Sequence, residues 1–288
     1  MIFLLLFLMA FSFPLGLYIM FNTDLGKNST YLIKIIFTII WFIYFVLFIQ
    51  AVRGPLYKIY KVPRAFLQNN LGVIFTNTAS TLAGIFPALL LVVILITQIQ
   101  EGVGIPTGSL SEVNPILDYL SDSIAPIIEE FVFRIFLIGS AASFILMIKS
   151  SSFDFKIFWW PAKYFSDLKS EMKIIYLVIV ISGILFGFAH LAFGGGWSIG
   201  KVTTSSLVGI VLGLFYFFYG VPACILLHWS FNYFVGSFYY FDEIVNGGSL
   251  TNIIDLTLIF IGIVSIVFLF IYIIQKIQKI HPLQSTHI

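Results

Sequence analysis

Charged residues are scarce in this chain of 288 residues. Asp, Glu, Lys and Arg together make up 10% of the sequence, whereas a soluble domain typically has about 25%. Hydrophobic residues make up 60%. This balance excludes a soluble globular protein, and the formal net charge of +2 gives no reason to expect nucleic-acid binding. The composition predicts an integral membrane protein that has the lipid bilayer as its first partner.

Cysteine is nearly absent, and internal repeats and low-complexity segments are not found. Cys224 is the single cysteine, which excludes an internal disulfide bond and any cysteine-based metal cage. Apolar runs leave no room for a separate globular module, so we expect one integral domain over residues 1–288. The segment 1–21 lacks the basic start of a secretory signal peptide, and we expect it to be a helix of the mature protein.

Long apolar runs dominate what is present. A helix needs about 20 apolar residues to cross the hydrocarbon core of a bilayer. Eight stretches satisfy this requirement, at about 2–21, 31–52, 72–99, 115–148, 173–193, 199–219, 222–240 and 252–274. The sequence therefore predicts an all-α integral membrane protein with about eight transmembrane helices.

Basic residues between these stretches predict the orientation of the chain. They gather in the loops around 53–71 and 149–172 and in the C-terminal tail, and they are Arg53, Lys58, Lys61, Arg64, Lys149, Lys156, Lys163, Lys169, Lys276 and Lys279. The positive-inside rule then places both termini in the cytoplasm, which fits an even number of helices. The 149–172 loop also holds seven aromatic residues, which is typical of a segment in the headgroup region of a cell membrane.

The fourth and seventh stretches are unusual for transmembrane helices. The fourth is longer than a bilayer requires, and its first half is polar. Asn114 and Pro115 form a good helix start, and Pro126 is expected to kink the helix just before two glutamates. The seventh follows the sixth after only the uncharged turn 220–222, which suggests a turn below the membrane surface.

Ionisable residues at membrane depth are costly and are therefore candidates for a functional site. The deepest ones in this sequence are Asp118, Asp122, Glu129, Glu130, Arg134, His190 and His228. Lys34, Lys201 and Asp255 lie near helix ends, where they are able to reach the interface. We expect the deep set to converge inside the bundle, on helices within about 115–240.

The two consecutive glutamates of the fourth helix are expected to differ. Glu130 and Arg134 are four residues apart on one helical face and are placed to form an ion pair. Glu129 points about 100° away around the helix, without that neutralising arginine. This geometry favours Glu129 as a general base, while an ion pair that only holds helices together is the alternative reading.

Two histidines and an asparagine follow on later helices. His190 ends the string Phe186-Gly187-Phe188-Ala189-His190, whereas His228 and Asn232 are four residues apart and share a face. The second arrangement suits the stabilisation of an oxyanion. A membrane histidine is often only a helix–helix hydrogen bond, but here two glutamates, two histidines and an asparagine occur on three helices.

The three motifs Glu-Glu-x-x-x-Arg, Phe-x-x-x-His and His-x-x-x-Asn, in this order, resemble the CPBP family of intramembrane proteases. This family, also called Abi, includes CAAX prenyl endopeptidases of the Rce1 type and bacteriocin-processing or self-immunity proteins. The resemblance implies that Glu129 and His190 activate a water molecule and that His228 and Asn232 stabilise the oxyanion. Glu130 and Arg134 would support them. The implied substrate is a prenylated or membrane-associated peptide or protein, cut near its C-terminus.

Three alternatives stay open at this stage. Glu129, His190 and His228 would also suit a catalytic zinc ion, although the family resemblance favours water activation without a metal. Buried carboxylates and histidines also make the relays of proton-coupled transporters, but no inverted repeat supports that class. A non-catalytic immunity or scaffold protein of the same fold is the third alternative. Cys224, four residues before His228, is expected mainly to fill the core.

Overall fold

The computed structural model describes residues 1–59, 78–109, 114–150, 153–193, 196–245 and 248–280. Over these residues the chain is built from helices and short helical turns, and the only β-type pairing is an isolated bridge between Gly108 and Trp197. The all-α prediction is confirmed. The predicted start of the third helix at 72–77 lies outside the described residues, as do Lys61 and Arg64.

Each of the eight predicted apolar stretches has a helical counterpart. Within the described residues, seven helical segments are long and apolar enough to cross a membrane. They are α1 (Ile2–Asn22), α3 (Tyr31–Ile59), α5 (Thr78–Gly102), the continuous run of α6 (Pro115–Glu130), η2 (Phe131–Gly139) and α7 (Ser140–Ser150), then α9 (Met172–Phe193), α10 (Ile199–Tyr219) and α13 (Ser249–Ile280). The eighth is the run of α11 (Val221–Trp229), η6 (Ser230–Phe234) and α12 (Val235–Val245).

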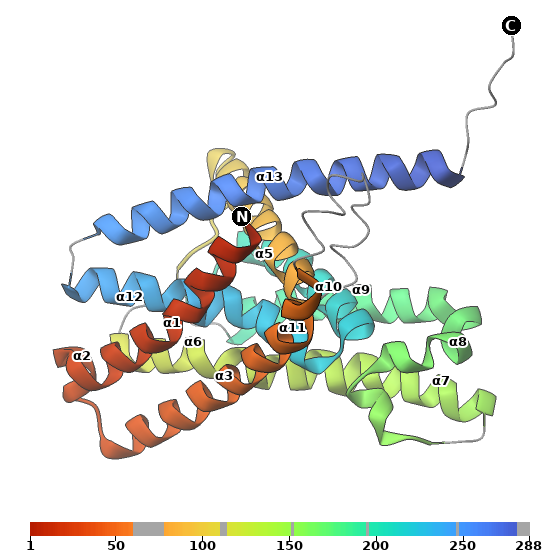
Figure 1. Cartoon of the computed structure of the whole chain (residues 1–288), viewed down its shortest axis with the longest axis horizontal. Helices are drawn as coiled ribbons and strands as arrows, with labels where there is room; N and C mark the ends of the chain where they lie inside the picture. Colours follow the sequence, from red (N-terminus) through yellow and green to blue (C-terminus); the bar gives the residue numbers. More distant parts are fainter. Residues whose placement is uncertain (60–77, 110–113, 151–152, 194–195, 246–247, 281–288) are drawn as a thin grey trace, which may run out of the picture.

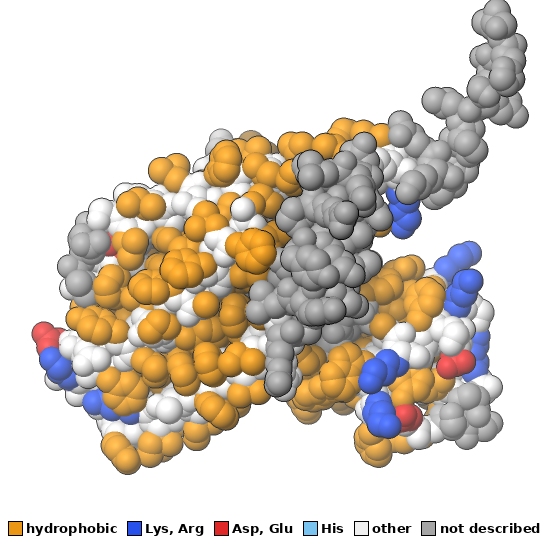
Figure 2. Space-filling model, in the orientation of Figure 1, with side chains coloured by type: hydrophobic (Ala, Val, Ile, Leu, Met, Phe, Trp, Pro, Cys, Tyr) orange, Lys and Arg blue, Asp and Glu red, His pale blue; other side chains and the backbone are white. Residues whose placement is uncertain are grey.

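The surface agrees with a protein that spans the bilayer several times. Most helices run roughly along the long axis of the molecule in Figure 1, with α13 along one edge and α6 and α7 along the other. Figure 2 shows hydrophobic side chains over the middle of this face and charged side chains at its two ends. The chain is therefore an integral, multi-pass membrane protein, and the cytoplasmic placement of its termini stays a prediction.

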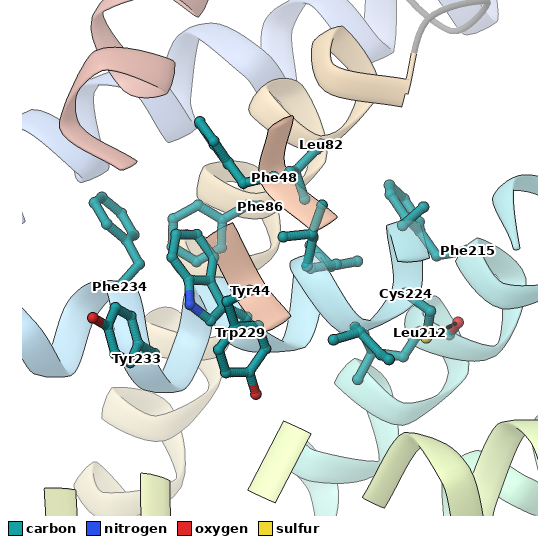
Figure 3. Packing of buried hydrophobic residues seen from close by; sticks show 14 of the residues in the cluster. Tyr44, Phe48, Leu82, Phe86, Leu212, Phe215, Cys224, Trp229, Tyr233 and Phe234 are labelled. Carbon is teal, nitrogen blue, oxygen red and sulfur yellow. Dashed lines mark hydrogen bonds between the residues drawn. The ribbon is translucent and has the colours of Figure 1, made fainter. Parts of the chain in front are cut away.

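The helix α11 lies at the centre of the bundle, and nearly all of its side chains are buried. Figure 3 shows Trp229 and Tyr233 packed among aromatic rings from other helices, including Tyr44 of α3 and Phe86 of α5. Trp229 stacks on Tyr233 with ring centroids 5.6 Å apart. Because this helix faces protein rather than lipid, it tolerates polar residues such as His228 that would be costly in contact with lipid.

Close packing of α9 on α10 depends on small residues. A side chain on Gly209 would put its Cβ 2.9 Å from the Cα of Gly183, and one on Gly187 would put it 2.5 Å from the carbonyl oxygen of Val202. Pairs of glycines four residues apart allow helix backbones to approach in this way within a membrane. The approach also leaves the carbonyl group of Gly209 within reach of a neighbouring helix.

The aromatic segment after α7 covers the turn between α10 and α11. It consists of the short turns η3 (Phe155–Phe158), η4 (Pro161–Tyr164), α8 (Phe165–Leu168) and η5 (Lys169–Glu171). The backbone N–H of Val221 donates to the carbonyl oxygen of Trp159 at 3.1 Å. Gly220 has φ of 83°, and a Cβ there would lie 2.7 Å from the same oxygen. The helix α11 therefore begins beneath a layer of protein, about two turns before His228.

Candidate active site

The helix α6 presents the two glutamates in different environments. Asn114 caps its start, because the side-chain oxygen accepts the N–H groups of Ile116 and Leu117 at 3.2 and 3.4 Å. At the other end, the side chain of Glu130 is 1% exposed, whereas that of Glu129 is 31% exposed. Consecutive residues of a helix point about 100° apart, which turns one carboxylate into the bundle and leaves the other accessible.

The carboxylate of Glu130 is held by three side chains. Arg134 lies four residues later, with its Nη1 atom 3.1 Å from Oε1 of Glu130, and both side chains are buried. The thiol of Cys224 donates to Oε2 of Glu130 at 2.6 Å, and Nδ1 of His228 lies 2.7 Å from Oε1. Glu130 is thereby the centre of a buried network that joins α6 to α11.

Arg134 extends this network to α9 and α10. Its Nη2 atom donates to the buried carbonyl oxygen of Gly209 at 3.1 Å. Its guanidinium carbon lies 4.3 Å from the centroid of the Phe186 ring, which is a cation–π contact. An arginine without exposed surface is stable at this depth because an anion, a carbonyl group and an aromatic ring surround it.

His228 lies between the two glutamates. One ring nitrogen, Nδ1, contacts Glu130, and the other, Nε2, is 3.6 Å from Oε2 of Glu129. Because a carboxylate only accepts hydrogen bonds, we assign a proton to Nδ1 of His228. A carboxylate that holds one ring nitrogen fixes the orientation of the other, which here faces the more accessible glutamate.

His190 reaches the same region from α9. Its Nδ1 atom lies 2.9 Å from the carbonyl oxygen of Phe186, which assigns Nδ1 as a donor and leaves Nε2 free to accept. The ring of Phe186 contacts the rings of both histidines, with centroid distances of 4.7 Å to His190 and 5.6 Å to His228. The two histidines thus meet across one phenylalanine, although they belong to different helices.

The structure unites some of the six candidate residues more closely than others. Glu129, Glu130, Arg134 and His228 form one connected group, which His190 joins through Phe186. Asn232 follows His228 by one turn in η6 and is partly buried, and its side chain makes no hydrogen bond to the residues that the structure describes. Its side chain is therefore not engaged by neighbouring protein groups.

The side chains fit a metal ion poorly. Over the described parts of the chain, no three His, Cys, Asp or Glu side chains form a group that could hold one. Structural and catalytic zinc sites need three or four protein donors around one point. The zinc alternative therefore gains no support from this arrangement.

Sequence reasoning gave too small a role to two residues. Cys224 precedes His228 by four residues and so shares its helical face, which is the signal for its hydrogen bond to Glu130. Phe186 has the same spacing from His190, and its ring lies against Arg134 and both histidines. The Phe-x-x-x-His motif includes Phe186, but the spacing alone does not indicate that its ring contacts Arg134 and His228 on other helices.

Both helices that carry the central group change to π-helical geometry beside it. The segment η2 begins directly after Glu130, and η6 begins directly after Trp229. Segments of this kind are rare and are found frequently at functional sites. The wider turns therefore mark this region independently of the chemistry of its side chains.

The fold and this group of residues define a multi-pass membrane protein with a polar site buried among α6, α9 and α11. A family model described as type II CAAX prenyl endopeptidase Rce1-like matches residues 120–234, the segment that contains all six candidate residues. Over this segment the chain is similar to the Rce1-like family of type II CAAX prenyl endopeptidases. Comparison with curated proteins and with solved structures gave no match.

Proposed function

We propose that the chain is an active intramembrane endopeptidase of a cell membrane that hydrolyses a peptide bond near the C-terminus of a prenylated or membrane-associated substrate. The observation that carries the proposal is the position of His228 between a buried glutamate and an accessible one. A purely structural ion pair would need only Glu130 and Arg134. The accessible Glu129 beside an oriented imidazole is the arrangement that a general base requires.

Glu129 is the proposed base, with His190 helping to orient the attacking water. The side chain of Glu129 is partly exposed, and the free Nε2 of His190 is able to accept a hydrogen bond from that water. The base removes one proton as the water oxygen bonds to the substrate carbonyl carbon. The carbonyl π electrons move to oxygen and give a tetrahedral oxyanion.

His228 and Asn232 are the proposed donors to this oxyanion. Nδ1–H of His228 is held by Glu130, and Nε2, which lies 3.6 Å from Oε2 of Glu129, is the proposed donor to the oxyanion that forms beside Glu129. The amide of Asn232 has no protein partner among the described residues and is available as the second donor. When the intermediate collapses, the C–N bond breaks and the proton held by Glu129 passes to the leaving amine. Pre-placed donors of this kind are usually the largest catalytic contribution.

Glu130 and Arg134 are proposed as positioning residues. Glu130 is 1% exposed and Arg134 is fully buried, so neither reaches a substrate directly. Glu130 instead orients His228, and Arg134 keeps Glu130 ionised and attached to α10 through Gly209. Their removal should act through the orientation of His228.

The test is cleavage by the purified protein in liposomes. The substrates are one fluorogenic peptide with a C-terminal prenylated cysteine motif and the same peptide anchored by a transmembrane helix. Glu129→Gln should lower kcat by about 10²- to 10⁴-fold, the usual contribution of a general base. Glu101→Gln changes an exposed glutamate at the end of α5 and serves as the matched control.

Thermal unfolding must be the same for both variants and the unchanged protein. Undiminished cleavage by the Glu129→Gln variant would refute the proposed base. A protein that cleaves neither peptide but takes up a solute with protons would replace the endopeptidase with a transporter.

A further inference from the structure

Lys201 occupies an unusual position at the start of α10. It lies in the first turn of that helix, where the helix dipole disfavours a positive charge. The side chain is partly buried, and its Nζ atom lies 3.6 Å from the centroid of the Trp197 ring. Trp197 is itself held by an antiparallel bridge to Gly108. The ammonium group therefore rests on a fixed aromatic surface instead of extending into solvent.

The electrostatic neighbours of Lys201 are residues of the candidate site. Its charge interacts with the carboxylates of Asp122 and Glu129 and with the imidazole of His190. None of the described carboxylates forms a direct ion pair with it, in contrast to Arg134, which contacts Glu130 at 3.1 Å. A lysine ammonium has three N–H donors. The N–H donors of Lys201 are therefore available to a group that comes from outside the chain.

We propose that Lys201, seated on Trp197, binds the C-terminal carboxylate of the substrate peptide. This inference rests on the proposed endopeptidase function and specifies its substrate class. The backbone of Val202, the next residue, packs against Gly187, which lies three residues before His190, and the free donors of the ammonium group suit a carboxylate.

The surrounding charges also give the peptide a direction. Asp122 and Glu129 repel a carboxylate, so the terminal group approaches the ammonium from the side away from the base that the Trp197 ring leaves open. The scissile bond then lies toward Glu129 and His228, and the leaving segment lies toward α10. Lys201 acts in this arrangement as a specificity residue and does not touch the reacting atoms.

The experiment compares two peptides of identical sequence, one with a free C-terminal carboxylate and one with a C-terminal amide. The unchanged protein should cleave the free acid with a kcat/KM at least about tenfold higher, as expected for a charge-assisted hydrogen bond. Lys201→Gln should bring this ratio close to one, mainly by raising KM for the acid. Lys201→Arg should restore part of the preference.

Lys34→Gln is the matched control, because Lys34 also lies in the first turn of an apolar helix, α3. It should leave the ratio unchanged. Equal cleavage of the two peptides by the unchanged protein would overturn the inference and leave the endopeptidase function intact. An equal loss of both activities in the Lys201→Gln variant would overturn it as well. Failure to cleave either peptide would instead refute the proposed function.

Discussion

Replacement of Arg134 by methionine tests how the buried network is held together. Methionine keeps most of the volume of the side chain and removes its charge and its N–H donors. Glu130 then stays at 1% exposure without its cation, and the carbonyl group of Gly209 loses the Nη2 donor that contacts it at 3.1 Å. We expect a large loss of stability, together with a misplaced His228.

The magnitude follows from the geometry. Two unit charges 3.1 Å apart attract each other by about 5 kcal/mol at an effective dielectric constant of about 20. Desolvation offsets much of this attraction in the intact pair, but removal of one partner leaves a buried charge and typically costs about 3–5 kcal/mol. The lost hydrogen bond to Gly209 adds about 1 kcal/mol. The free energy of unfolding should therefore fall by about 4–6 kcal/mol.

A double variant separates charge burial from catalysis. Glu130→Gln combined with Arg134→Met removes both charges, so most of the lost stability should return, with a coupling energy of about 3 kcal/mol. Activity should stay low, because a neutral amide orients His228 less firmly than a carboxylate does. Unfolding in detergent and peptide cleavage are measured for the two single variants and the double variant. Single variants as stable as the unchanged protein, or additive losses in the double variant, would refute the reasoning.

Three further predictions concern other parts of the molecule. Cys224→Ala removes the thiol that donates to Glu130 and should lower kcat about tenfold, whereas Cys224→Ser should keep most of the activity. Gly209→Val forces α9 away from α10 and should lower the unfolding free energy by about 1–3 kcal/mol, which thermal unfolding will report. The Tyr164 hydroxyl donates to Asp154 and holds the pKa of that carboxyl below its ordinary value. The contact therefore stabilises the segment at pH values above the pKa of Asp154 in the unfolded chain, and this stabilisation is lost as the pH falls through the lower pKa of Asp154 in the folded protein. An NMR titration of the carboxyl group should show a higher pKa for Asp154 in the Tyr164→Phe variant.

Local spacing in the sequence was sufficient for the helices and for one of the key contacts. The run of apolar residues predicts each helix because its length must match the bilayer, and the helical segments follow the expected boundaries closely. The ion pair of Glu130 with Arg134 also follows from four-residue spacing on one helix. Both predictions depend only on the geometry of a single helix.

Contacts between helices could not be read in the same way. Counting residues from helix ends places His190 and His228 near opposite membrane surfaces, yet both rings contact Phe186. Their approach depends on the covered turn at Gly220 and on the close packing of α9 against α10. Helix offsets and crossing angles are set by packing across the whole bundle, which no single motif contains.

The two consecutive glutamates show how one short motif supplies two different functions. Because a helix turns about 100° per residue, Glu130 faces the bundle interior and Glu129 faces the more open side. To exchange their roles, Arg134 and Cys224 would have to contact Glu129 instead of Glu130. The accessible space would have to lie beside Glu130. His228 contacts Glu130 through one ring nitrogen and faces Glu129 through the other, so it links the buried carboxylate to the accessible one. The adjacency of the two glutamates is thus what allows one imidazole to be both anchored by the protein and directed toward a substrate.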